Sequence, residues 1–436
     1  MPATDAQFEA EWSLLQSACS ASANRGDSGQ NKEKSNLRGL SQRPLNWESL
    51  LQLAEQHGVV PILYHALSSS GSEVPPAALA QLKQGYETNL RRTLLLAREL
   101  IRILDHFDGL AIDVIPYKGV ALAETLYGDI ALRQAGDIDL LVRAPDLSRI
   151  KASLKDLGYT PHLPLSEPEE RAYLGSGYEC AFDGVLGRNL LEVQWALQPR
   201  FYAVDFEMES VFRRAIKVSV AGRNMKTPSA EDLFLILALH AAKHVWGRLI
   251  WLCDIAQIVK LPALNWNWIS ETATSLGIVR ILQVTLVLTN RMLGVAIPAA
   301  AEKSLSADSA ALALADEIAN ALTYAHSLEI RPSTSTQKYA NAGLDPAKAG
   351  RELGVGTVVS GHFLRQDKTL MVILEAVDVK SNKVVWNGTL TAPLDNLIVL
   401  RNQMEKEVRQ ELVPVLGITQ TAATTTAPTN QEAYDL

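Results

Sequence analysis

With 436 residues, the chain is too long for one ordinary hydrophobic core, so two or three domains are expected. Hydrophobic residues make up 47% of it and charged residues 20%, a balance typical of a soluble globular protein and not of a disordered one. The net charge of −7 provides no electrostatic footprint for nucleic acid, which is therefore not expected as a partner.

Cysteine usage and hydropathy further restrict the class of protein and the compartment that the sequence fits. The three cysteines are scattered at Cys19, Cys180 and Cys253 and form neither a disulfide framework nor a zinc spacing. This favours a reducing compartment, and the cytoplasm is the expected location. Acidic residues precede any apolar run at the N-terminus, so no signal peptide is predicted. The longest apolar stretch, 278–301, is interrupted by charged residues, so no membrane span is expected.

Residues 1–105 are predicted to form a helical N-terminal section that carries an insert. The segment 20–44 is rich in Ser, Asn, Gly, Lys and Arg and almost devoid of apolar residues, which predicts a flexible surface insert. From Asn46, a favourable helix cap, apolar residues recur at helical spacing. Residues 86–106 predict a strongly amphipathic helix.

Residues 106–225 change to short alternating strands and helices, which predicts a compact core. Strands are expected at 110–116, 136–142, 178–183 and 189–196, with a further strand or edge at 211–220. Helical periodicity then runs almost without interruption through 226–325, after a pattern at Ser229 and Asp232 that resembles a capping box. The fold class expected is α+β, with a small mixed sheet flanked by helical sections.

Residues 326–418 are predicted to form a separate small α/β module. A helix is expected at 346–353, alternating strands at 356–364, 369–379 and 383–390, and a last helix at 393–416. The module shows no paired carboxylates and no nucleophile–base spacing, so catalysis is not expected there. An edge strand could dock a protein partner. The Thr- and Ala-rich segment 419–436 is predicted to be a disordered tail.

The most informative stretch is the run Gly136-Asp-Ile-Asp-Leu-Leu-Val142. In a strand, residues i and i+2 face the same side, so Asp137 and Asp139 are expected to project together. A hard divalent cation such as Mg²⁺ would relieve their mutual repulsion. Glu192 lies inside another apolar strand, where Glu is disfavoured unless it is paired or ligating. We therefore predict Asp137, Asp139 and Glu192 as catalytic metal ligands, although Asp-x-Asp pairs also occur at solvated strand ends.

Lys118 and Gly119 follow one predicted strand and open a helix. A glycine there lets the backbone approach a phosphate, and the free N–H groups of a helix start attract anions. Lys118 could neutralise phosphate charge, and Arg133, in the polar loop before Asp137, could reach a triphosphate. The alternatives are an ordinary strand-to-helix turn and a solvated loop arginine.

His240 and His244 lie one helical turn apart, and Arg248 follows them. The spacing permits metal binding, but the glutamate of the His-Glu-x-x-His motif is absent. A wall of the substrate site formed by His240, His244 and Arg248 is one interpretation, and a packing face of a helix is the other.

The residues above resemble a family of uncharacterised nucleotidyltransferases in the DNA polymerase β superfamily. The similarity covers about residues 45–300 and is carried by segments 46–48, 53–59, 118–123, 126–128, 137–142 and 191–195, together with Arg133 and the region 240–254. The resemblance implies a small mixed sheet of nucleotidyltransferase type, two Mg²⁺ ions on Asp137, Asp139 and Glu192, and a nucleotide positioned at Gly119.

The implied activity is transfer of a nucleoside monophosphate from an NTP to a small-molecule or protein acceptor. Val120 follows the glycine where a small residue is usual, and Gln194 stands where His would be expected. These departures keep an alternative open, in which a degenerate fold binds a nucleotide or partner without turnover.

The C-terminal segment resembles a different module, the TolB amino-terminal-like domain, which is related to FlgO-type domains. The matching segments are 315–318, 330–333, 349–355 and 359–361, with the strand that ends at 384–386. The resemblance implies a non-catalytic module that binds or assembles with a protein partner.

Overall fold

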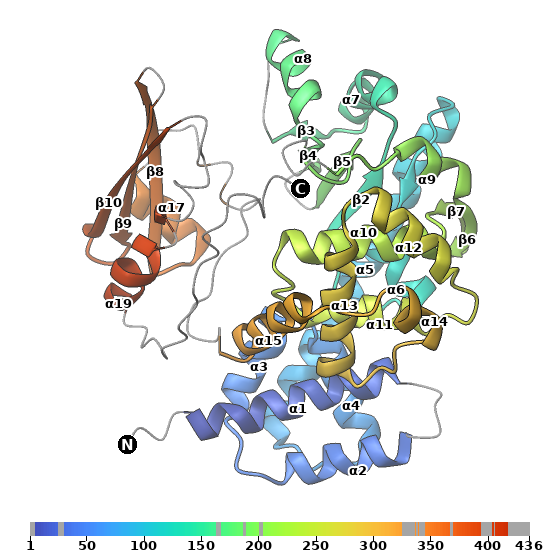
Figure 1. Cartoon of the computed structure of the whole chain (residues 1–436), viewed down its shortest axis with the longest axis vertical. Coiled ribbons are helices and arrows are strands. Elements are labelled where there is room, and N and C mark those ends of the chain that lie inside the picture. The colour runs from blue at the N-terminus through green and yellow to red at the C-terminus, as the bar shows by residue number, and fades with distance from the viewer. Residues whose placement is uncertain are drawn as a thin grey trace. The chain divides into compact units, whose positions relative to one another are not determined.

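The computed structural model describes residues 5–24, 30–162, 167–185, 189–199, 204–324, 345–366, 369–393, 403–404 and 406–416, with positions 336 and 339. The chain divides into two compact units, Met1–Ala325 and His326–Leu436 (Figure 1). The first unit contains a five-stranded mixed sheet among many helices, and the second a three-stranded sheet. The predicted α+β class is confirmed.

Five helices form the N-terminal part of the first unit: α1 (Asp5–Ala23), α2 (Gln30–Ser41), α3 (Trp47–Gln56), α4 (Val60–Ser70) and α5 (Pro76–Gly109). The side chain of Asn46 caps α3 by accepting a hydrogen bond from the Ser49 N–H at 3.1 Å. Helices α1, α2 and α4 pack against one another (Figure 1).

The prediction of a flexible insert at 20–44 is wrong for its described part, and residues 25–29 lie outside the described residues. Residues 20–23 complete α1 and residues 30–41 form α2. Leu37 and Leu40, three residues apart on one face of α2, are buried in the core. Two leucines at this spacing are enough to hold an otherwise polar helix against its neighbours, and composition alone did not reveal them.

The sheet of the first unit has the strand order β1-β2-β5-β4-β3. Its strands are β1 (Ile115–Pro116), β2 (Asp137–Leu141), β3 (Thr160–Pro161), β4 (Glu179–Asp183) and β5 (Leu190–Gln194). Strands β2 and β5 are parallel, and the other neighbours are antiparallel. The strand expected at 110–116 shortens to two residues because α5 runs on to Gly109.

One face of this sheet is apolar. Ile138 and Leu140 of β2 and Leu191 and Val193 of β5 are buried in a core shared with α5 and α7 (Leu147–Asp156). Each such aliphatic side chain contributes about 1.5–3 kcal/mol when fully buried. Because side chains alternate along a strand, the acidic residues of β2 and β5 project from the opposite face.

The remaining elements of the first unit follow in chain order. They are α6 (Val120–Tyr127), α8 (Glu167–Ser176), α9 (Met208–Arg214), β6 (Ile216–Val220), β7 (Arg223–Thr227), α10 (Ala230–Lys243), α11 (Leu249–Val259), α12 (Trp266–Ser275), α13 (Val279–Leu293), α14 (Ala299–Ser304) and α15 (Ser309–Tyr324). The segment 211–220, expected as a strand, divides between the end of α9 and β6. None of the described helices combines the length and the apolar character that a membrane crossing requires.

The second unit contains α17 (Pro346–Leu353), β8 (Thr357–Gln366), β9 (Thr369–Asp378), β10 (Lys383–Pro393), a π-helical turn (Val408–Leu412) and α19 (Val413–Val415). The strands are antiparallel in the order β10-β9-β8. Ala376, Trp386 and Leu412 form a small core. The last helix does not begin at Pro393, because that residue closes β10 and pairs with Thr369. The predicted tail 419–436 lies outside the described residues.

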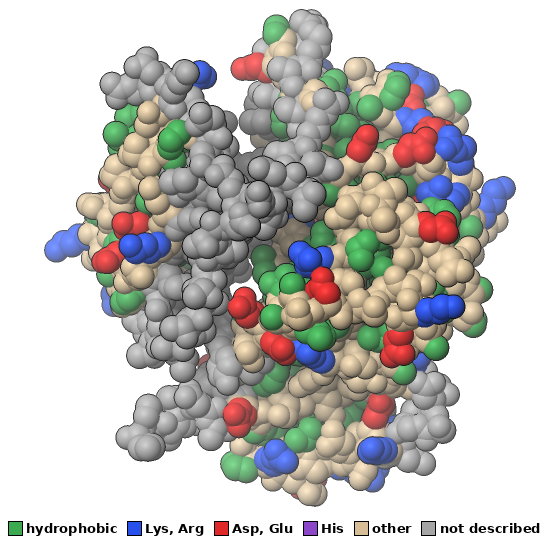
Figure 2. All heavy atoms as spheres, in the orientation of Figure 1, with side chains coloured by type: hydrophobic (Ala, Val, Ile, Leu, Met, Phe, Trp, Pro, Cys, Tyr) green, Lys and Arg blue, Asp and Glu red, His purple; other side chains and the backbone are tan. Residues whose placement is uncertain are grey.

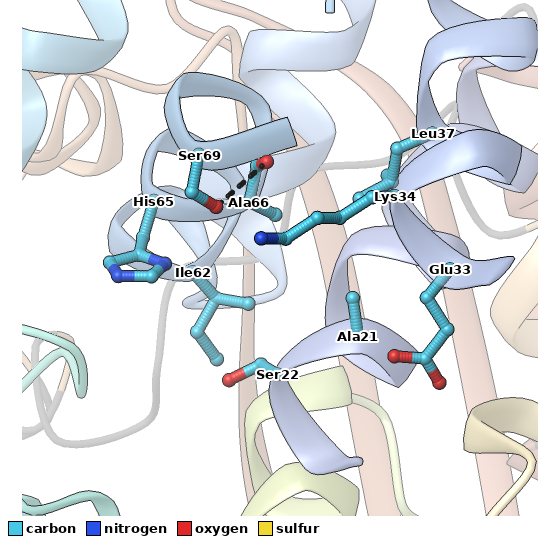
Figure 3. A pocket seen from close by; sticks show the side chains of 9 residues that line it. All are labelled: Ala21, Ser22, Glu33, Lys34, Leu37, Ile62, His65, Ala66 and Ser69. Carbon is cyan, nitrogen blue, oxygen red and sulfur yellow. Dashed lines mark hydrogen bonds between the residues drawn. The ribbon is translucent and has the colours of Figure 1, made fainter. Parts of the chain in front are cut away.

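The visible surface shows no concentration of positive charge among the described residues. On the face in Figure 2, Lys and Arg side chains are interspersed with Asp and Glu. This arrangement agrees with the negative net charge of the sequence.

Candidate active site

Three carboxylates share the polar face of the sheet in the first unit. Asp137 and Asp139 lie on β2, and the parallel register pairs Asp139 with Glu192 of β5. Neighbouring strands lie about 4.8 Å apart, so these side chains leave the sheet side by side. The structure therefore brings together the three acids that the sequence singled out.

The proximity of these acids disfavours their charged forms. Asp139 is 3% exposed, whereas Asp137 and Glu192 are partly exposed. Burial, and then the charge of Asp139, raise the pKa of Glu192 to about 8. The same two causes raise the pKa of Asp137 to about 6. The three carboxyl groups of this face can therefore ionise together only beside positive counter-charge.

Lys118 supplies one such charge. It lies two residues after β1, and its Nζ donates a hydrogen bond to Asp139 Oδ1 at 3.0 Å. The amine also lies 4.7 Å from the centre of the Tyr117 ring. Burial opposes the charge of Lys118, but Asp139, Tyr117 and Glu192 raise its pKa well above the ordinary value. Lys118 is therefore a charged lysine held against the acidic strand.

Gly119 brings the start of α6 close to β2. Its φ is +55°, and a Cβ at this position would lie 3.0 Å from the Asp137 carbonyl oxygen. A side chain would therefore meet both backbone strain and a steric conflict. As the N-cap of α6, Gly119 also leaves the first helical N–H groups without a side-chain cap. An anion-attracting helix end thus lies beside the carboxylates.

Arg133 is engaged in a buried ion pair. Its Nε and Nη2 donate to the two carboxylate oxygens of Asp254 on α11, at 2.8 and 2.9 Å. The Tyr127 hydroxyl donates to the same carboxylate at 2.8 Å. Arg133 is 7% exposed, so the alternative of a solvated loop arginine is wrong. The pair fixes the loop before β2 to α11, and a contact between Arg133 and a triphosphate stays a prediction.

His240 and His244 form an aromatic cluster with Trp251 of α11. The ring centres are 4.9 Å apart for the two histidines, and 5.4 and 5.3 Å from that of Trp251. Burial lowers the pKa of His244 to about 4. Burial, and then the charge of Lys118, lower the pKa of His240 far below its ordinary value. His240 thus lies within the field of Lys118, whereas the His244 side chain is exposed. Arg248 is exposed at the start of α11.

Comparison with known proteins identifies the family. The sequence model of a family described as uncharacterised nucleotidyltransferase matches residues 43–294. The chain belongs to this nucleotidyltransferase family. The matched region contains the three acids, Lys118, Gly119, Arg133 and the histidine cluster. No curated protein matches the chain.

Two solved structures of the antibiotic-resistance factor ANT(2'')-Ia are similar to parts of the chain. Its solution structure is 15% identical over 46% of this chain and 95% of its own, with a TM-score of 0.27. Its crystal structure in complex with adenylyl-2''-tobramycin is 16% identical over 46% of this chain and 98% of its own, with a TM-score of 0.26. Superpositions with TM-scores this low say nothing about the geometry of the site.

In this member of the family, Gln194 holds the third acid. Its Nε2 donates to Glu192 at 3.3 Å and to Glu179 of β4 at 3.1 Å. Its Oε1 accepts a hydrogen bond from the Tyr117 hydroxyl at 2.6 Å. The amide therefore uses both donor hydrogens and its acceptor to fix the orientation of Glu192.

The network continues to α10. The Tyr178 hydroxyl donates to Glu179 at 2.6 Å, and Lys243 donates to that hydroxyl in turn. No pattern in the sequence singles out Tyr117, Tyr178, Glu179 or Lys243. The alternation of β5 shows that Gln194 shares a face with Glu192, but the partners from β4 and α10 become visible only in the folded chain.

The nucleotidyltransferase offers the right donor chemistry for Mg²⁺, since carboxylate oxygens are its preferred protein ligands. Within the described residues, no three or more His, Cys, Asp or Glu side chains are arranged so that they could hold a metal ion. Lys118 engages Asp139 and Gln194 engages Glu192. Metal binding at these acids would therefore require Lys118 to leave Asp139, whereas Gln194 contacts one oxygen of Glu192 and can keep that contact.

Proposed function

We propose that the chain is a Mg²⁺-dependent nucleotidyltransferase that moves a nucleoside monophosphate from an NTP to a hydroxyl of a small molecule or protein. The observation that supports this most is the alignment of Asp139 with Glu192 across the parallel strands β2 and β5, beside the start of α6. Asp137, Asp139 and Glu192 would hold the metal. Bound Mg²⁺ would supply Lewis-acid stabilisation of the phosphoryl oxygens.

The other residues of the site have roles that follow from their positions. The N–H groups at Gly119 and the start of α6 would bind phosphate oxygens. Lys118, once released from Asp139, would place its charge on the triphosphate. Gln194 would keep Glu192 oriented. The acceptor hydroxyl loses its proton to solvent, its oxygen forms a bond to the α-phosphorus, and the bond to pyrophosphate breaks.

A second candidate function is nucleotide binding without turnover. It is favoured by the ion pair between Lys118 and Asp139, which occupies one acid with a protein cation. Incubation with each labelled NTP and a cell extract, with Mg²⁺ present, separates the two. Transfer predicts a labelled acceptor and released pyrophosphate, whereas simple binding predicts retention of intact NTP.

Mg²⁺ binding should release about one proton per site at pH 7, because Glu192, with its pKa raised to about 8, must lose its proton to ligate. The apparent affinity should then rise about tenfold per pH unit between 6 and 8. Calorimetry in two buffers of different ionisation enthalpy measures this release. The Glu192→Gln protein should release far less, and an affinity independent of pH would contradict a role of Glu192 as ligand.

We also propose that the second unit is a TolB amino-terminal-like module that binds a protein partner. Its strand β8 lies at the edge of the sheet and carries exposed apolar side chains, among them Phe363 at 72% and Leu364 at 55% exposure. An edge strand of this kind accepts an added strand.

A chain that ends at Tyr324 should keep its transferase activity within about twofold, since the three acids, Lys118 and Gly119 belong to the first unit. Steady-state assays of both lengths measure this. Loss of the chemical step in a truncated protein that still folds and binds Mg²⁺ would show that the second unit completes the active site.

A further inference from the structure

Lys243, the last residue of α10, brings a second lysine to the neighbourhood of the acids. Its Nζ donates a hydrogen bond to the Tyr178 hydroxyl and lies 4.2 Å from the centre of the Tyr178 ring. The hydroxyl and the ring belong to one residue, Tyr178, which carries no charge. No carboxylate among the described residues lies within ion-pair distance of this ammonium, in contrast to Lys118.

A continuous chain of hydrogen bonds joins Lys243 to the third acid. It runs from Lys243 through Tyr178 to Glu179, and from Glu179 through the Gln194 amide to Glu192. This network ties the ammonium of Lys243 to Glu192 on the polar face of the sheet.

The two lysines act on each other electrostatically. Burial lowers the pKa of Lys243 and the charge of Lys118 lowers it further, whereas Glu179, Glu192 and Asp139 oppose these effects. An anion that reaches both of two mutually repelling ammonium groups stabilises the two charges together. The three carboxylates of the site, by contrast, are stabilised by a cation.

The corner after Lys243 is held in an unfavourable conformation. Val245 and Trp246 have φ values of +52° and +49°, where a β-branched residue such as Val is rarely found. The indole N–H of Trp246 donates to Thr285 Oγ1 at 2.9 Å in the core, which anchors the turn. Such strain persists only where the surrounding structure enforces it. The end of α10 is thus held firmly in place.

We propose that Lys243 binds the β- and γ-phosphates of the NTP, the part that leaves as pyrophosphate. This inference rests on the function proposed above. The amine exchanges a neutral phenol for an anionic oxygen, which makes a stronger, charge-assisted hydrogen bond. When the acceptor oxygen bonds to the α-phosphorus, the electron pair of the broken P–O bond goes to pyrophosphate. Lys243 stays protonated and stabilises that charge.

The test compares binding of triphosphates and monophosphates to the full chain. Each of the four α,β-methylene NTP analogues, which cannot be cleaved at that bond, is titrated with Mg²⁺ by calorimetry, and so is each NMP. Lys243→Met keeps the aliphatic stem over Tyr178 and removes the charge. It should weaken analogue binding about tenfold to thirtyfold, with NMP binding unchanged. Lys243→Arg should recover part of the loss.

Two controls separate this role from a structural one. Lys83→Met removes a lysine from the exposed face of α5 and should change neither affinity. Tyr178→Phe removes the resting partner of Lys243 but keeps the ring, so analogue affinity should hold or improve. If Tyr178→Phe weakens binding as much as Lys243→Met does, Lys243 only supports the network, and the inference is overturned.

The outcomes also distinguish this inference from the proposed function. If the Lys243→Met protein binds the analogue as tightly as the wild type does, and the wild-type chain transfers nucleotide, only the role of Lys243 is overturned. A wild-type chain that binds none of the analogues overturns both.

Discussion

The Asp139→Asn protein should lose at least about a thousandfold in nucleotide transfer, which corresponds to about 4 kcal/mol of transition-state stabilisation. Asp139 is the most buried of the three acids and lies opposite Glu192 in the parallel register. Asn keeps the shape and one acceptor oxygen but removes the negative charge that a divalent cation requires.

The fold should tolerate this change. The Asn oxygen can still accept the hydrogen bond that Lys118 donates to Asp139 at 3.0 Å. The charge of Asp139 is also the second cause of the raised pKa values of Asp137 and Glu192, so its removal relieves repulsion. These effects oppose the loss of the ion pair, and the free energy of unfolding should change by no more than about 2 kcal/mol.

The measurement is the initial rate with the NTP that the labelled screen selects, over a Mg²⁺ titration. Asp156→Asn, at the exposed end of α7, is the matched control and should keep the wild-type rate. Retention of full activity by both Asp137→Asn and Asp139→Asn would falsify the assignment of the acids.

Local alternation was sufficient to predict part of the site. An Asp-x-Asp pair in an apolar strand must share one face, and Glu192 between apolar neighbours signals the same kind of position. The adjacency of β2 and β5 is a property of tertiary pairing, because Glu192 lies 53 positions after Asp139, and the resemblance to a family supplied that expectation.

Residues that depend on distant partners were predicted poorly. Arg133 was expected either on a phosphate or in solvent, but its partner Asp254 lies 121 residues further along the chain. Lys243 ends α10, and the apolar periodicity of that helix does not predict its hydrogen bond to Tyr178. Helix α2 was missed for the same reason, since its two buried leucines matter only once α1 and α4 are beside it.

Arg133→Met should lower the free energy of unfolding by about 3–5 kcal/mol, because it leaves a carboxylate buried without its counter-charge. Asp254 is 1% exposed, and both of its oxygens accept hydrogen bonds from Arg133. The remaining hydrogen bond from Tyr127 cannot neutralise it. Urea unfolding of the full chain measures the loss. Arg91→Met, which removes an exposed arginine 3.9 Å from Glu87, should change stability by less than about 0.5 kcal/mol.

A double-mutant cycle decides whether this arginine is structural. Arg133→Met combined with Asp254→Leu replaces the whole ion pair by apolar side chains, which removes the unpaired charge and should recover most of the lost stability. If Arg133 serves only to join the loop before β2 to α11, nucleotide affinity should recover together with stability. Recovered stability with NTP affinity still reduced tenfold or more would instead assign Arg133 to the triphosphate, as the sequence suggested, with Asp254 as its resting partner.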